Sequence, residues 1–169
     1  VYHVSNLGDS GEGSIREGIE TASGARTIVF EVGGTVDLQS PLRISVERLT
    51  IAGQTAPGGI GLRGYPLVLA GARDVVLRYL RLRTGDVNAE GARGRPGNGN
   101  ADLPGDAADA LSIFGSQRVI VDHVSASWSM DETLSVTGSQ AVTVQHSIIS
   151  ESLNDSFHPE GLHGYGSLL

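Results

Sequence analysis

The sequence predicts an all-β protein, a right-handed, single-stranded parallel β-helix with a short capping helix near its N-terminus. The first observation is an internal repeat, because residues 109–129 align without gaps on residues 132–152 at a spacing of 23 residues. The second is that the repeated unit consists of short β runs and Gly or Ser turns. A short period made of strands is typical of a solenoid. The repeat also places His123 and His146 one period apart, which predicts a ladder between coils and argues against a catalytic pair.

The N-terminal segment supplies a strand and a helix. Residues 1–6 alternate polar and apolar side chains, as a short strand does. Ser14 and Glu17 form a capping-box pattern, in which each side chain can satisfy a backbone N–H group at the start of a helix. Ile15, Ile19 and Ala22 give this helix one apolar face. We expect the helix to cover the exposed end of the solenoid core.

A series of short strands follows and sets the length of each coil. They are predicted at residues 27–30, 35–38, 42–45, 49–51, 61–63, 67–69, 75–83, 119–127 and 142–150. With Arg48, Asp74, Arg118 and Ala141 aligned, successive coils are 26, 44 and 23 residues long. The long coil contains a predicted loop, residues 84–105, whose composition fits either a cover over a cleft or disorder. We expect residues 1–169 to form one domain.

The composition of the chain excludes several classes of binding partner and of chemistry. The formal net charge is −7 and the chain contains no lysine, so it lacks the basic surface that nucleic-acid binding requires. No apolar stretch is long enough to predict a membrane span. The absence of cysteine excludes disulfides and thiol chemistry. No secretion leader is recognisable and both ends read as cuts through a longer protein, so we expect a chain truncated at both ends.

The acidic residues predict a metal site. The 23-residue period places Asp109, Glu132 and Asp155 at one position of three coils, with Asp131 beside Glu132. Neighbouring coils lie about 4.8 Å apart, so these like charges should raise one another's pKa or recruit a cation. Oxygen ligands from several chain segments suit Ca²⁺. The alternative is a row of solvated turn residues, and Asp106 fits the loop better than this column.

Several longer motifs resemble one protein family. They are VYHVSNLGDSGEGSIRE (1–17), IAGQTAPG (51–58), RYLRLR (78–83), DHVSASWSMDE (122–132), SESLND (150–155) and HGYG (163–166). Together they resemble bacterial pectate lyases of polysaccharide lyase family 1, along essentially the whole chain. The resemblance implies a secreted β-helix enzyme that cleaves polygalacturonate, an acidic polysaccharide, by β-elimination. It also implies Ca²⁺ as the cofactor and an arginine that removes the substrate proton.

The resemblance implies roles for particular residues as well. Asp109 and Asp131 match calcium ligands of the family. Ser135 stands where a further aspartate is common, so either Glu132 compensates or the affinity for calcium is lower. Glu160 stands where a substrate-binding lysine is expected. The catalytic arginine of the family lies downstream of the Gly-Tyr-Gly segment, so we expect it beyond Leu169 and assign no catalytic residue here.

Four residues are candidates for substrate binding. Trp128, the only tryptophan, can stack on a sugar ring or anchor the turn that carries it. Arg83 can contact a uronate carboxylate in a bidentate manner or pair with a carboxylate of the protein. His158 and His163 lie in the last segment and can line a cleft.

Three functions compete. The first is a calcium-dependent pectate lyase. The second is a non-catalytic β-helix that binds acidic glycans or self-associates end to end through uncapped coils. The third is a related pectin-degrading enzyme of the same fold. Pectin lyases do not need calcium, so the acidic column argues against them.

Overall fold

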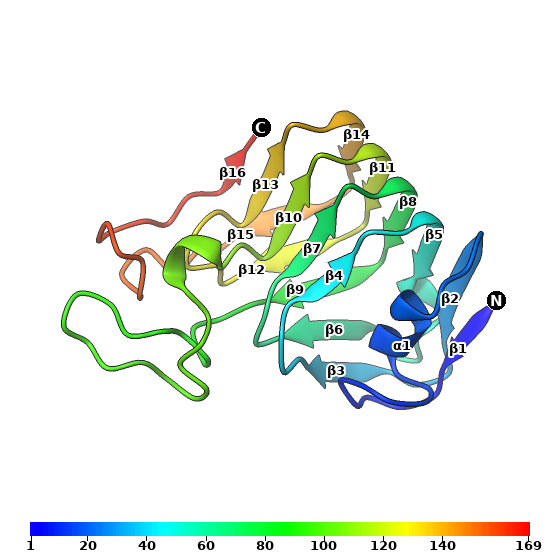
Figure 1. Cartoon of the computed structure of the whole chain (residues 1–169), viewed down its shortest axis with the longest axis horizontal. Coiled ribbons are helices and arrows are strands. Elements are labelled where there is room, and N and C mark those ends of the chain that lie inside the picture. Colours follow the sequence, from blue (N-terminus) through cyan, green and yellow to red (C-terminus); the bar gives the residue numbers. More distant parts are fainter.

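The chain winds through five successive coils that build three parallel β-sheets (Figure 1). A computed structural model describes all 169 residues. Each coil contributes one strand to sheet A, then one to sheet B, then one to sheet C. Every strand pairs in parallel with its equivalent in the neighbouring coil. The predicted right-handed parallel β-helix is therefore confirmed.

The strands are short and evenly distributed among the sheets. Sheet A contains β1 (Tyr2–Val4), β2 (Arg26–Phe30), β5 (Glu47–Ala52), β8 (Arg73–Arg78), β11 (Gln117–Asp122) and β14 (Gln140–Gln145). Sheet B contains β3 (Gly34–Asp37), β6 (Ile60–Arg63), β9 (Leu80–Arg83), β12 (Ser125–Ser127) and β15 (Ile148–Ser150). Sheet C contains β4 (Leu42–Ile44), β7 (Leu67–Ala70), β10 (Leu111–Phe114), β13 (Leu134–Thr137) and β16 (Ser167–Leu168).

The register of the coils follows the predicted spacings. In sheet A, Leu49 pairs with Val75, Val75 with Val119, and Val119 with Val142. The residue before each of these is left-handed, with φ between 53° and 57°, at Arg48, Asp74, Arg118 and Ala141. A left-handed conformation costs a non-glycine residue about 1–2 kcal/mol. This left-handed conformation recurs in four coils because equivalent residues need the same backbone conformation for the strands that follow to pair in register.

The corner between sheets C and A is built from the repeated Gly-Ser pair. Gly115 and Gly138 both have φ of 57°, a conformation that glycine adopts without a Cβ clash. The serine after each glycine links its coil to the one before. Ser116 Oγ accepts the N–H of Ala72 at 3.1 Å, and Ser139 Oγ accepts the N–H of Ser116 at 3.0 Å. The identical residues of the repeat therefore have a structural explanation at this corner.

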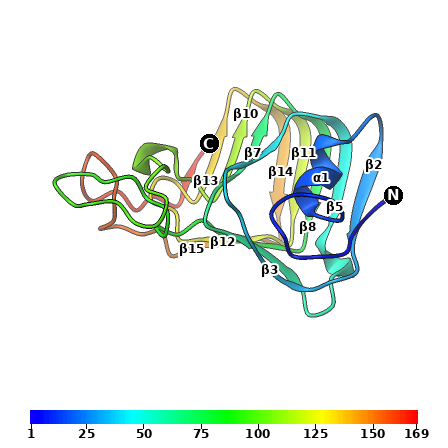
Figure 2. The same ribbon diagram turned by 60° about the horizontal axis from the view of Figure 1, so that its bottom comes forward.

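The helix α1 (Ile15–Glu20) covers the first coil, as expected (Figure 2). Ser14 is the N-cap, and its Oγ accepts the N–H of Glu17 at 3.2 Å. Glu17 completes the pattern one residue earlier than a standard capping box, at Gly13 instead of the N-cap residue. The Glu17 carboxylate accepts the N–H of Gly13 at 3.0 Å and the hydroxyl of Tyr2 at 2.6 Å, because β1 brings that hydroxyl within reach. The apolar face of the helix is buried in the core through Ile15 and Ile19.

The core is aliphatic and runs along the axis of the β-helix. One cluster of 35 buried residues extends from Val4 of β1 to Phe157, which follows β15, and stacked Leu, Ile and Val side chains dominate it. The apolar residues of the last coil are more exposed, as in Val144 at 37% and Ile148 at 63%. End-to-end association through this coil stays a prediction. No helix of the chain is long and apolar enough to cross a bilayer.

The predicted loop of residues 84–105 packs onto the coils. Ala89 and Leu103 form an isolated parallel bridge, and both are buried in the core cluster. Arg93 and Arg95 each donate to the carbonyl of Ser156, at 2.6 and 3.1 Å. The loop and the turn of residues 151–166 therefore lie against each other, on the same side of the β-helix (Figures 1 and 2). The loop has a defined conformation, which favours the covering role over disorder.

Core stacking should dominate stability. Leu77 is fully buried on β8, whereas Ile120 on the neighbouring β11 is 40% exposed. We expect Leu77→Ala to lower the free energy of unfolding by about 2–5 kcal/mol, because it leaves a cavity. The control, Ile120→Ala, should change it by about 0.5 kcal/mol or less. Chemical denaturation measures both, and equal losses would contradict the stacked-core account.

Candidate functional site

The candidate site lies at the corner between sheets B and C, where the connections are longest. In three successive coils the chain passes this corner through the loop of residues 84–105 with the 3₁₀ helix η2 (Gly105–Ala107), then through residues 128–133, and then through residues 151–166. Irregular segments from three coils thus meet at one side of a rigid scaffold (Figure 1). The other 3₁₀ helix, η1 (Gly53–Thr55), lies at a different corner, between β5 and β6.

Three carboxylates come together at this corner. Asp109 precedes β10, and Asp131 and Glu132 precede β13 in the next coil. Their carboxylate oxygens lie within 4.8 Å of one another. Ser135 donates a short hydrogen bond to Oδ2 of Asp109, and its hydroxyl lies 3.2 Å from that of Ser112. The structure therefore brings together all four predicted metal ligands.

Burial and like charge make this cluster electrostatically strained. Burial, together with the negative charges of Glu132 and Asp109, raises the pKa of Asp131 to about 7. Burial also raises the pKa of Asp109, although the hydrogen bond from Ser135 opposes that shift. A cation bound between these groups would relieve the repulsion.

Two histidines join the same cluster. His158 and His163 are stacked with ring centroids 3.5 Å apart, and both point Nε2 at Oδ1 of Asp131, at 3.6 and 3.0 Å. Nδ1 of His158 accepts the N–H of Glu160 at 3.2 Å, so its proton sits on Nε2, toward Asp131. Burial, together with the charge of His163, lowers the pKa of His158. The two imidazoles thus contact a carboxylate of the cluster, and their side chains are only 5% and 11% exposed.

The predicted third member of the acidic column is wrong. Asp155 lies in the turn between β15 and β16 and pairs with Arg95 at 2.9 Å and Arg93 at 3.5 Å. The pairing of Leu134 with Ser167 instead puts Tyr165 level with Glu132. The last coil is longer than 23 residues at this corner, so the period breaks there. The same insertion explains why the sequence did not connect His158 and His163 to the cluster.

The donor set of the cluster fits Ca²⁺. The three carboxylates and the Ser135 hydroxyl are hard oxygen ligands, and they come from two coils, which allows an irregular coordination shell. The histidines complement this set by packing their Nε2 atoms against Oδ1 of Asp131, and groups that hold a ligating carboxylate in place tune its metal affinity.

A groove beside this corner contains two of the predicted substrate-binding residues. It has a volume of about 400 Å³ and is lined in part by Arg83, Trp128 and Arg63. The Arg83 guanidinium lies 5.6 Å from the centroid of the Trp128 ring and donates to Ser125, to its carbonyl at 2.7 Å and its hydroxyl at 2.8 Å. It is ion-paired to no carboxylate of the protein. Trp128 is 44% exposed, and its indole N–H donates to Glu151 at 3.2 Å.

Comparisons with known proteins agree with this architecture. No protein-family model matches the chain. Over 134 residues, 79% of the chain, it is 39% identical to a protein named probable pectate lyase C from Aspergillus terreus. The identity is 40% to the protein of that name from Aspergillus fumigatus and 41% to that from Emericella nidulans. The chain spans 27% of the length of these fungal relatives, and the bacterial type that the motifs suggest stays a prediction.

A solved structure has the same fold. The crystal structure of jun a 1, the major allergen from cedar pollen, matches with a TM-score of 0.64, over 85% of this chain and 42% of that chain. The two sequences are 22% identical, so the match concerns the fold.

The cluster should make stability depend on pH. The folded-state pKa of Asp131, about 7, exceeds its value in an unfolded chain, so the folded state holds more protons between roughly pH 4 and 7. The contribution of Asp131 to stability is therefore complete below about pH 4 and is lost as the pH rises to 7. In chelator, Asp131→Asn should gain stability relative to the parent chain from pH 5 to pH 8, as measured by urea unfolding.

A control separates this effect from general surface charge. Asp155 also lies at this corner, but its hydrogen bond and ion pair with Arg95 lower its pKa. Asp155→Asn should therefore show no such gain between pH 5 and pH 8. A gain of the same size in both variants would contradict the assignment to the carboxylate cluster.

Proposed function

We propose that this chain forms part of a calcium-dependent polysaccharide lyase that cleaves polygalacturonate by β-elimination. The observation that carries the proposal is the carboxylate cluster of Asp109, Asp131 and Glu132, in which burial and mutual repulsion raise the pKa of Asp131 to about 7. The names of the fungal relatives support the same activity. Such an enzyme acts outside the cell, because its polymeric substrate does not cross a membrane, and we therefore propose secretion.

The residues of the cluster have separate tasks. Asp109, Asp131 and Glu132 would hold the ion, and Ser135 orients Asp109 through its short hydrogen bond. His163 lies against Oδ1 of Asp131 and fixes the direction of that carboxylate. Bound Ca²⁺ would join the acidic protein to an acidic polymer and stabilise the negative charge that develops when the substrate loses its proton.

The neighbouring groove is proposed to bind the sugar chain. Trp128 offers an exposed ring face, and Arg83 provides a cation that is ion-paired to no protein carboxylate. His158 and His163, the other two candidates, have little exposed surface, so we place their contribution in the support of Asp131. No arginine is ion-paired or hydrogen-bonded to the three carboxylates. We propose that the base is the arginine expected beyond Leu169, as the resemblance to the lyase family implies.

Product formation tests the lyase proposal. In the whole enzyme of which this chain forms part, polygalacturonate with Ca²⁺ should give unsaturated uronides, followed by ultraviolet absorbance, and chelator should abolish them; this chain alone, which lacks the proposed base, should give none. Asp131→Asn should lower the rate at least about 100-fold, which equals about 2.7 kcal/mol. The control Asp74→Asn removes an exposed carboxylate that pairs with Arg118 in sheet A, and it should retain the rate.

The same experiment separates the competing functions. Calcium-dependent binding of a galacturonate oligomer without product would support the site and assign the base to another segment. Binding that chelator and Asp131→Asn leave unchanged would overturn the calcium site and favour a non-catalytic glycan-binding β-helix.

The groove has its own test. We expect Trp128→Ala to weaken binding of a galacturonate oligomer roughly tenfold, or about 1.4 kcal/mol, because a stacking surface is lost. Calorimetry should show an unchanged affinity for Ca²⁺. Phe114→Ala, which removes an aromatic ring 61% exposed on β10, is the matched control and should have no effect. Equal losses in the two variants would contradict the groove assignment.

A further inference from the structure

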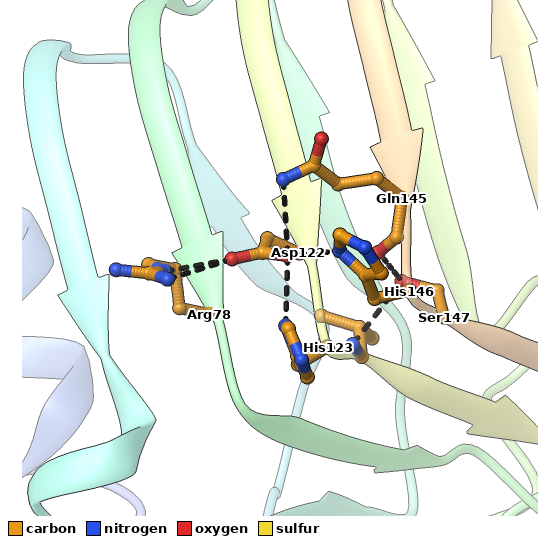
Figure 3. Close-up of polar contacts among 7 residues, drawn as sticks. Arg78, Asp122, His123, Gln145, His146 and Ser147 are labelled. Atoms are coloured by element: carbon orange, nitrogen blue, oxygen red, sulfur yellow. Dashed lines mark hydrogen bonds and ion pairs between the residues drawn. The ribbon is translucent and has the colours of Figure 1, made fainter.

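A second cluster of potential ligands, drawn in Figure 3, lies at the corner between sheets A and B, whereas the carboxylate cluster lies at the corner between sheets B and C. Tyr79, His123 and His146 occupy equivalent positions in three coils, directly after β8, β11 and β14. All three are left-handed, with φ of 55°, 55° and 49°. The His123 ring stacks on Tyr79 at 4.5 Å and lies 4.9 Å from His146. The predicted histidine ladder is therefore present, and Tyr79 extends it by one coil.

The ladder surrounds one buried carboxylate. Asp122 has a side chain only 5% exposed, and Arg78 holds its Oδ2 through Nε at 2.9 Å and Nη2 at 2.8 Å. Its Oδ1 receives Nδ1 of His123 at 2.8 Å and Nδ1 of His146 at 3.2 Å, together with the Gln145 amide at 3.2 Å. Burial alone would raise the pKa of Asp122, but these hydrogen bonds hold the pKa far below its usual range. The carboxylate is thus ionised and fixed.

The ring nitrogens of both histidines are directed at the same oxygen. Figure 3 shows the two imidazoles and Gln145 gathered on one side of Asp122, with Arg78 on the other. Three nitrogens therefore contact a single oxygen, and each imidazole directs its Nδ1 at that oxygen. One ring nitrogen of each imidazole and one carboxylate oxygen all lie within 4.8 Å of one another. Donors on a tetrahedral Zn²⁺ ion are about 3.3 Å apart, so small ring rotations suffice to bring them around one ion.

We propose that Asp122, His123 and His146 form a binding site for a divalent late transition metal such as Zn²⁺. The ligands are Oδ1 of Asp122 and the two Nδ1 atoms, and a proton that either Nδ1 carries passes to Nε2 or to solvent when the ion binds. Two imidazoles and one carboxylate favour Zn²⁺, Cu²⁺ or Ni²⁺ over Ca²⁺. The oxygen donors Asp109, Asp131, Glu132 and Ser135 at the other corner favour Ca²⁺ instead, but His158 and His163 beside Asp131 offer two imidazoles as well, so the test has to distinguish the two places.

The surroundings are suited to such an ion. Arg78 is the only cation in contact with the cluster, and because it occupies Oδ2 it fixes Asp122 as a ligand through one oxygen. Second-sphere contacts of this kind set the orientation of a ligand and tune metal affinity. The histidine side chains are 41% and 66% exposed, so an ion can enter from solvent and keep water in its remaining position.

Zinc titration of the full chain tests the proposal. Competition with a chromophoric chelator should show one equivalent of Zn²⁺ that His146→Gln removes or weakens at least tenfold. His146 is mostly exposed, so this variant should fold normally, which circular dichroism verifies. The matched control is His3→Gln, since His3 pairs with one carboxylate, Glu31, at 2.8 Å and has no second imidazole beside it. That variant should keep the equivalent.

Two measurements exclude the other histidine pair as the source. In His163→Gln the same equivalent should persist, and excess Ca²⁺ should not displace it. With Cu²⁺, electron paramagnetic resonance should show coupling to two nitrogens in the parent chain and to one in His146→Gln. Unchanged zinc affinity in His146→Gln, or loss of the equivalent in His163→Gln alone, would overturn the proposal and leave the ladder a purely structural stack.

Discussion

Parallel pairing of each strand with its equivalent in the next coil is the constraint on which the rest of the structure depends. It places residue over residue about 4.8 Å apart, so Leu49, Val75 and Val119 stack in the core. The same pairing extends to the corners, where each side chain lies next to the equivalent side chain of the neighbouring coil. Polar or charged residues that recur at the repeat spacing therefore form a column on the surface.

The three corners use this stacking in different ways. At the corner between sheets C and A, Gly115 and Ser116 form a compact, repeated turn held by Ser Oγ atoms. At the corner between sheets A and B, left-handed aromatic residues stack around the buried Asp122. The two longest connections between strands of neighbouring sheets, residues 84–110 and 151–166, lie at the corner between sheets B and C. The scaffold thus confines irregular chain, and the proposed lyase chemistry, to one side.

Electrostatics link the main cluster to its proposed substrate. A protein with a net charge of −7 repels a polyanion, and the partly buried group of three carboxylates adds to that repulsion. The raised pKa of Asp131 records the cost of holding these charges together without a counter-ion. An ion that relieves this repulsion would also provide the positive charge that an acidic polymer requires. Asp122 is the contrasting case, because Arg78 and neighbouring donors already compensate its charge.

The sequence by itself determined the β-helix, its coil lengths and the meeting of Asp109, Asp131, Glu132 and Ser135, because period and alternation are local properties that pairing turns directly into geometry. Only the tertiary structure decided what the insertions do. It removed Asp155 from the acidic column, gave it to Arg93 and Arg95, and brought His158 and His163 onto Asp131. It also joined Arg78 and both ladder histidines to Asp122. An insertion interrupts the repeat, so the spacing of residues along the chain no longer predicts where its side chains lie. Their placement depends on long-range packing.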